Sequence, residues 1–155
     1  MEINLLFEDG LEGCLDGGWL QGIAEQVLVA QGSQPDVEMG LVIASQARVQ
    51  ELNKTYLGRD EPTDVLAFAM LPETGDSSFA SPPDGIEHLG EVLICYPQAV
   101  KQAQERRHAV KREVAILVVH GVLHLLGYNH SEPEPARRMA AREAAILEHI
   151  GGRLP

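Results

Sequence analysis

This 155-residue sequence has few cysteines, no basic residues near its N-terminus and no long apolar run. Its two cysteines, Cys14 and Cys95, are too few for a disulfide scaffold, and we expect both thiols to be reduced. No apolar run approaches the length of about 18 residues that a membrane span needs. Because residues 1–7 also lack the basic and long apolar regions of a secretory signal, we expect a cytoplasmic protein.

Charge is unevenly distributed along the chain, whose formal net charge is −11. Residues 1–44 contain eight acidic side chains and no Lys or Arg, so all twelve basic residues lie from Arg48 onward. Taken alone, a balance this negative argues against a nucleic-acid binder, which usually has a basic surface. The stretch from Lys101 to Arg112 has five basic residues and one acid, which allows a local basic surface. Ordinary solvated helix faces are the alternative interpretation.

Length and apolar content suit one domain, residues 1–155, with a sizeable core. Apolar periodicity and capping residues predict strands at 2–7, 37–44, 64–68 and 89–95, and helices at 16–31, 45–56, 97–108, 111–126 and 133–149. The mixed order of about four strands and five helices favours an α+β fold. The composition of residues 70–88, rich in Pro, Ser, Gly and Asp, predicts a long loop that is mobile or functional.

Three of the six histidines lie within eleven residues of a predicted apolar helix and the turn after it. His120 and His124 are four residues apart, which places both imidazoles on one helix face. Gly127 ends the helix, and His130 follows closely enough to turn back toward the pair. A lone histidine in such a helix is usually a core residue, but three imidazoles with an open position are typical of catalytic zinc. We therefore predict one zinc ion per chain, bound by His120, His124 and His130.

The histidine spacing, H-x3-H-x2-G-x2-H, equals that of the metzincin peptidases. Those enzymes place a glutamate directly after the first histidine as general base, and here that position is Gly121. A protease of that mechanism is therefore excluded unless another carboxylate, such as Asp64 or Glu91, takes the place of the glutamate. A zinc ion in such a site can acidify a water or polarise a phosphoryl oxygen, and the residues alone do not decide between these roles.

The segment HGVLHLLGYNH, residues 120–130, resembles the signature H-G-x-L-H-L-x-G-Y-D-H of the YbeY family, bacterial metal-dependent endoribonucleases of ribosomal RNA maturation. Two further segments agree in the same order. Residues 52–56 and 60–68 are similar to L-N-x-x-Y-R-x-x-D-x-P-T-D-V-L-S-F, and residues 89–94 resemble the strand L-G-D-I-x-I. The similarity thus runs from about residue 50 to residue 130, while residues 1–45 share only the order of elements.

The resemblance implies a single α+β domain with a small mixed sheet and a zincin-like histidine helix across it. It implies zinc held by His120, His124 and His130, and hydrolysis of single-stranded RNA during small-subunit rRNA processing and ribosome quality control. The ribosome or its small subunit would be the partner, in the bacterial cytoplasm, with no membrane involved.

Three positions depart from the family pattern. Leu57 stands where the family has an arginine that is thought to matter for activity, and Arg59 could take over its role. Asn129 stands for Asp, and Ala67 for Ser. The basic residues expected to contact RNA are Lys54, Arg59, Lys111 and Arg112, and we predict that they lie closer to the metal than the acids of residues 1–44 do.

Two alternatives to the endoribonuclease stay open from the residues alone. One is a zinc hydrolase of another ester or amide, which a carboxylate within reach of the metal would favour. The other is a ribosome-assembly factor whose zinc is chiefly structural, which a fourth ligand closing the site would favour. An open metal site beside a basic groove would favour the endoribonuclease.

Overall fold

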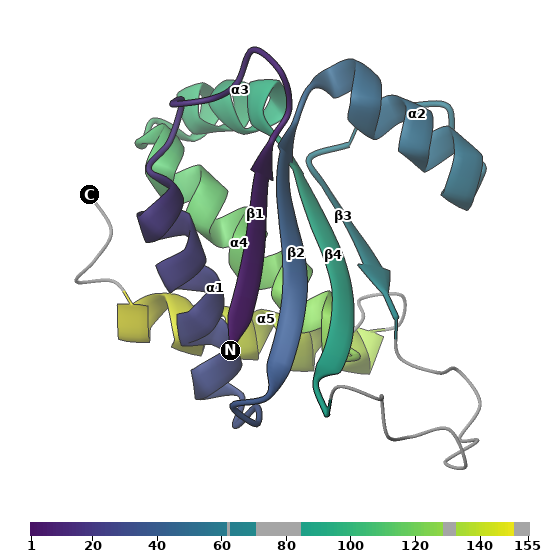
Figure 1. Cartoon of the computed structure of the whole chain (residues 1–155). Helices are drawn as coiled ribbons and strands as arrows, with labels where there is room; N and C mark the ends of the chain where they lie inside the picture. Colours follow the sequence, from purple (N-terminus) through teal and green to yellow (C-terminus); the bar gives the residue numbers. More distant parts are fainter. Residues whose placement is uncertain (62, 71–84, 129–132, 151–155) are drawn as a thin grey trace.

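The computed structural model describes residues 1–61, 63–70, 85–128 and 133–150, and within them it has four strands and five helices (Figure 1). The strands are β1 (Glu2–Phe7), β2 (Val37–Ala44), β3 (Val65–Ala69) and β4 (Glu87–Cys95). The helices are α1 (Gly17–Ala30), α2 (Gln46–Leu57), α3 (Tyr96–Arg106), α4 (Val110–Leu125) and α5 (Pro133–Ile150). The α+β fold predicted from the sequence is confirmed.

The four strands form one mixed sheet in the order β1-β2-β4-β3. β1 pairs with β2, and β2 with β4, in parallel, whereas β3 runs antiparallel to β4 at the edge. In the register, Leu41 lies between Leu5 of β1 and Val92 of β4, and Val92 faces Ala67 of β3. β3 is therefore an edge strand, which pairs with β4 on one side and with no other described strand of this sheet.

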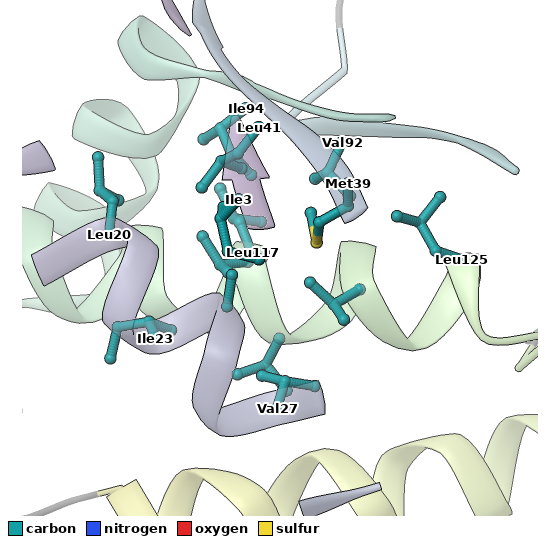
Figure 2. Packing of buried hydrophobic residues seen from close by; sticks show 14 of the residues in the cluster. Ile3, Leu20, Ile23, Val27, Met39, Leu41, Val92, Ile94, Leu117 and Leu125 are labelled. Carbon is teal, nitrogen blue, oxygen red and sulfur yellow. The ribbon is translucent and has the colours of Figure 1, made fainter. Parts of the chain in front are cut away.

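One face of the sheet is covered by helices, and α4 passes directly behind the strands in Figure 1. Alternate residues of β2, including Met39 and Leu41, point from the sheet toward this layer, as expected for a period of two. They meet Ile23 of α1 and Leu117 of α4 in the core drawn in Figure 2. α4 contacts β3, β4, α1, α3 and α5, which explains why its sequence is apolar on nearly all sides.

Among the described residues, α2 covers the other face of the sheet only in part. Ser45 begins this helix by accepting a hydrogen bond from the backbone N–H of Arg48 (3.2 Å), as its sequence predicts. A small second cluster forms beneath α2 from Ala44, Val49, Leu66, Leu93 and Cys95. Beside this cluster the sheet forms the floor of a cavity of about 910 Å³. We call this cavity the open-face cavity.

The predicted element boundaries lie within two residues of the observed ones. The largest consequence is at the expected loop, residues 70–88. Its last two residues belong to β4, which already begins at Glu87. The backbone N–H of Glu87 donates to the carbonyl of Asp36 (2.8 Å), and His88 Nδ1 lies 2.5 Å from Glu38 Oε2. These partners are about 50 residues away, so local composition did not reveal them. Residues 71–84 of the expected loop lie outside the described residues.

In the part of the chain that the structure describes, none of the helices combines the length and apolar character needed to cross a membrane.

Candidate metal centre

α4 brings His120 and His124 to the same side of one helix, as their spacing predicts. Their ring centroids lie 4.7 Å apart, with an angle of 65° between the ring planes. Both side chains are partly exposed, whereas the residues between them, Gly121 to Leu123, are buried. The two imidazoles therefore lie at the surface of α4, whereas most of this helix is packed against the sheet and other helices.

Gly121 is a point of close approach between α4 and the sheet. A Cβ atom at this position would lie 2.5 Å from Cγ1 of Val92 on β4 and 3.3 Å from Cγ2 of Val65 on β3. The first distance is shorter than any normal contact, so no side chain fits without a shift of the sheet or helix. The position that holds the general base in metzincins is thus closed here to any glutamate. The absence of a glutamate directly after His120 thus has a steric reason, and a carboxylate from elsewhere in the chain would be needed for that mechanism.

A cavity of about 350 Å³ opens beside the histidines. We call it the histidine cavity. Its walls come from three parts of the chain: α4 with His120, Gly121 and His124; the edge strand β3; and the end of α2 with the loop that follows it. The residues of the last two parts that line it are Asn53, Leu57, Arg59, Glu61, Thr63, Asp64, Val65, Leu66 and Ala67.

The loop after α2 is held in place by the buried Asn53. Gly58 ends the helix in a left-handed conformation with φ of 71°, which glycine adopts without strain. The backbone N–H of Arg59 donates to the carbonyl of Asn53 (3.3 Å), and Asn53 Nδ2 donates to the carbonyl of Glu61 (2.9 Å). Asn53 is only 3% exposed, so these bonds form in a shielded environment. They fix Arg59 at the wall of the histidine cavity.

Two carboxylates, Glu61 and Asp64, also line the histidine cavity. Asp64 Oδ2 accepts a hydrogen bond from Gln102 Nε2 (3.2 Å), and the Asp64 carbonyl accepts one from the backbone N–H of Cys95 (2.8 Å). Glu91, the other carboxylate suggested by the sequence, lies across the sheet in the open-face cavity and packs over Gly40. Of the two carboxylates considered from the sequence, Asp64 thus lines the histidine cavity and Glu91 lines the open-face cavity.

Of the four basic residues predicted to contact RNA, Arg59 lines the histidine cavity. Lys54 lies 3.9 Å from Asp60, with both side chains largely exposed. Lys111 Nζ lies over the ring of Trp19, 5.4 Å from its centroid. Lys111 and the exposed Arg112 sit in the first turn of α4, so they precede His120 by about 12 Å or more along the helix axis. A contact of Lys54, Lys111 or Arg112 with RNA stays a prediction.

Glu143 on α5 is a site residue that the sequence analysis missed. Its Oε1 contacts Nδ1 of His120. The two residues are 23 positions apart, so no short motif joins them. One signal was available: Met139, Ile146 and Ile150 form the buried face of α5, and Glu143 falls at helical spacing on that same face. An acid at a core-facing position of an amphipathic helix calls for a partner, and His120 is that partner.

A model of the family described as Endoribonuclease YbeY matches residues 17–151 of the chain. The chain belongs to the YbeY family. A relative from Dehalococcoides mccartyi strain CBDB1, named Endoribonuclease YbeY, is 43% identical over 155 residues, with 97% of this chain and 93% of that protein covered. A relative of the same name from Moorella thermoacetica is 42% identical over 132 residues, with 85% of both chains covered.

The fold also matches a solved structure. The solution structure of TM1509 from Thermotoga maritima superimposes with a TM-score of 0.63 at 26% identity, with 97% of this chain and 90% of that chain covered. Two of the three departures from the YbeY sequence pattern, Leu57 and Ala67, lie in the wall of the histidine cavity. The third, Asn129, lies outside the described residues.

The donor set at the histidine cavity suits a zinc ion. Neutral imidazole is a preferred zinc ligand, and a ligand histidine usually gives its second ring nitrogen to a carboxylate, as His120 does to Glu143. Among residues 1–61, 63–70, 85–128 and 133–150, no three His, Cys, Asp or Glu side chains gather closely enough to hold a metal. The predicted third ligand, His130, lies outside these ranges. The assignment of His120, His124 and His130 as zinc ligands thus stays a prediction. The positions of His120 and His124 in the structure are compatible with it.

Proposed function

We propose that this chain is a zinc-dependent endoribonuclease, a single hydrolase domain that cleaves single-stranded RNA in the cytoplasm. We further propose that it acts in small-subunit rRNA processing and ribosome quality control, with the ribosome or its small subunit as partner. The observation that carries the proposal is the histidine cavity, which His120, His124 and Arg59 all line in a chain of the YbeY family. Curated relatives of this chain are named endoribonucleases.

His120, His124 and His130 would hold one zinc ion. Gly127 has a φ of +100°, a conformation that lets the chain leave the helix sharply. When bound, the zinc would supply Lewis-acid activation of a phosphodiester or of the attacking oxygen. Because imidazole must be neutral to bind metal, we expect zinc affinity to fall as the solution is acidified.

Arg59 supplies positive charge where the substrate phosphate would lie. A guanidinium can donate two parallel hydrogen bonds to a phosphodiester, and Asn53 fixes the backbone that carries it. Leu57, at the family's arginine position, is 57% exposed and offers no such donor. Arg59 therefore takes the role of the arginine absent at position 57, from two residues further along the same wall.

An acidic protein of this kind binds RNA through few contacts. The formal net charge of −11 repels a polyanion, so affinity depends on the local charge of Arg59 and on the metal. We expect the logarithm of affinity for single-stranded RNA to fall with the logarithm of salt concentration at a total slope of roughly −1 to −3, since each phosphate contact contributes about −0.7.

The decisive experiment compares RNA cleavage by zinc-loaded, chelated and His124→Ala protein. His149→Ala is the matched control, because His149 is an exposed histidine of α5 outside the histidine cavity. Chelation and His124→Ala should each slow cleavage by more than about 100-fold, since metal-ion catalysis lowers barriers by several kcal/mol. Full activity of the chelated protein would remove zinc from the proposal, and co-sedimentation with purified small subunits tests the ribosome partner separately.

The carboxylates of the histidine cavity favour one second candidate, a zinc hydrolase of another ester or amide. Asp64 lines the cavity with the histidines and could accept a proton from an attacking water. Asp64→Asn keeps an oxygen for the hydrogen bond from Gln102 and removes the base. Retained RNA cleavage in this variant supports the endoribonuclease without Asp64 as base. RNA left intact by wild-type protein, together with hydrolysis of an activated ester that depends on Asp64, would establish the second candidate.

A further inference from the structure

The contact between α5 and His120 differs from an ordinary ion pair on the surface. Glu143 Oε1 meets Nδ1 of His120, and the two side chains are only 22% and 29% exposed. Glu143 lies on the face of α5 that also carries the buried Met139, Ile146 and Ile150. Helix packing thus aims the carboxylate at this ring, and no long flexible side chain must be ordered from solvent to make the contact.

The chemistry of the contact selects one form of the ring. An ionised carboxylate only accepts hydrogen bonds, so Nδ1 of His120 must carry the proton that it donates. A neutral imidazole protonated on Nδ1 has its lone pair on Nε2. His120 lines the histidine cavity, and the proposed zinc would need this lone pair as a ligand. The carboxylate therefore sets both the tautomer and the orientation of the ring that the proposed zinc requires.

A second histidine–glutamate pair, between the residues just before α4 and its first turn, provides an internal contrast. At the other end of the helix, His108 Nε2 lies 2.9 Å from the fully buried Glu113, which also accepts from Arg106 (2.7 Å). That carboxylate has two partners, Arg106 and His108, and none of the three residues lines the histidine cavity. The pair at Glu113 joins α3 to α4 and is explained by structure alone. Glu143 differs because its partner faces the cavity.

The turn of α5 that carries Glu143 is also anchored by the neighbouring Arg142. Arg142 Nη2 donates to the carbonyl of Ala30 at the end of α1 (2.6 Å), and its Nε contacts Oε1 of Gln31. Gln31 Nε2 in turn donates to the hydroxyl of Tyr128 (2.9 Å), just after α4. Neighbouring residues of α5 therefore hold the end of α1 and the imidazole of His120. This double attachment limits how far the carboxylate can drift.

We infer that Glu143 is a positioning residue, which holds His120 with its proton on Nδ1 and thereby presents Nε2 to the metal. The inference rests on the proposed function in one respect only, namely that His120 is a zinc ligand. Loss of such a carboxylate typically weakens metal binding by about 10–100-fold. Glu143→Ala should show a loss in this range, and Glu143→Gln, whose amide oxygen still accepts from Nδ1–H, a loss of less than about tenfold.

Two measurements test the inference on full-length wild type, Glu143→Ala, Glu143→Gln and Glu148→Ala, the last a control at an exposed acid of the same helix. The first is the ring-nitrogen NMR spectrum of His120 in metal-free protein, at a pH where the ring is neutral. Wild type and Glu143→Gln should show the proton on Nδ1, and Glu143→Ala should lose that preference. The second is zinc affinity by competition with a chromophoric chelator, which should follow the fold-changes above and stay unchanged in Glu148→Ala.

The outcomes separate this inference from the proposed function. Wild-type protein that binds no zinc but shows the Nδ1 tautomer, lost in Glu143→Ala, would contradict the proposed zinc enzyme and retain the positioning by Glu143. Wild-type protein that binds zinc with an affinity that Glu143→Ala leaves unchanged would overturn the inference and leave the zinc enzyme intact. A proton on Nε2 of His120 in metal-free wild type would overturn it as well. A Glu143→Gln protein as weak as Glu143→Ala would also count against it, because the retained acceptor should rescue binding.

Discussion

The histidine cavity, of about 350 Å³, and the open-face cavity, of about 910 Å³, share two walls. Consecutive residues of α2 face opposite ways: Leu52 and Tyr56 line the larger cavity, and Asn53 and Leu57 the smaller one. β3 divides similarly, because Phe68 lines the larger cavity and Ala67 the smaller one. The two environments are thus made by the same two elements, whose opposite sides carry different side chains.

The two cavities differ in chemistry more than in position. The open-face cavity is lined largely by apolar side chains and by the acids Glu8, Asp9 and Glu91, with Arg48 at its wall and no histidine among its lining residues in the described chain. The histidine cavity is smaller and also has two carboxylates, Glu61 and Asp64, but it adds two imidazoles, a guanidinium and an amide. Volume alone would favour the open-face cavity, whereas donor atoms suited to metal and phosphate favour the smaller cavity as the proposed catalytic site.

The largest expected difference between the cavities concerns zinc. His120→Ala, His124→Ala and His130→Ala should each reduce the zinc content of purified protein from about one ion per chain to near zero, because two remaining ligands do not hold zinc firmly. Atomic absorption of dialysed protein measures this content, with His149→Ala as the control. Full zinc retention in His130→Ala would remove the predicted third ligand and leave the site to other residues.

The next effect concerns the close approach of α4 to the sheet behind the histidine cavity. Gly121→Ala places a methyl group 2.5 Å from Val92 Cγ1, and we expect it to lower the free energy of unfolding by about 1–3 kcal/mol. Thermal unfolding followed by circular dichroism measures the loss. Gly22→Ala is the control, because a Cβ at this helical position meets nothing within 4 Å. Pairing Gly121→Ala with Val92→Ala should recover part of the stability, and an undiminished Gly121→Ala protein would show that the helix stands further from the sheet.

A smaller effect is expected from the charge at the wall of the histidine cavity. Arg59→Ala should make the salt slope of RNA binding shallower by about 0.7 and weaken binding to all sequences alike, because a phosphate contact carries no sequence information. Fluorescence anisotropy at several salt concentrations measures the slope. Introducing Leu57→Arg into Arg59→Ala should restore it, since position 57 lines the same cavity. An unchanged slope in Arg59→Ala would show that Arg59 does not replace the arginine absent at position 57.

The smallest effect is expected on the open face. Glu91→Gln removes a charge that the sheet separates from the histidines, so RNA cleavage should change by less than about twofold, in line with the weak influence of screened distant charges. Steady-state cleavage assays in parallel with wild type measure this. A tenfold loss would break the comparison, because it would make the open face part of the catalytic machinery.

Thiol reactivity gives a related test of burial beneath α2. Burial raises the pKa of the Cys95 thiol, so this group stays protonated and unreactive at neutral pH. Burial also raises the pKa of Cys14, which is less deeply placed. A disulfide reagent such as dithionitrobenzoate should therefore modify Cys14 slowly in folded protein and Cys95 only on unfolding, and rapid modification of Cys95 would indicate that α2 opens.

The local features of this fold could be predicted because they depend on neighbouring residues. The N-caps Asp16 and Ser45 each accept a hydrogen bond from a backbone N–H within three residues, and the spacing of His120 and His124 follows from the turn of a helix. The segments shared with the YbeY family identified the chain before any contact was known. The edges of elements were less certain where partners are distant, as at Glu87.

The amino-acid sequence by itself thus determined the elements, the α+β class, the histidine pair and the family. Only the tertiary structure decided which other groups surround that pair. It placed Asp64 in the histidine cavity and Glu91 across the sheet, brought Arg59 to the cavity wall, and joined Glu143 to His120. Each of these outcomes depends on the packing of elements far apart in the chain, which helical or strand periodicity does not encode. The close packing of α4 against β3 and β4 also explains why the residue after His120 must be glycine.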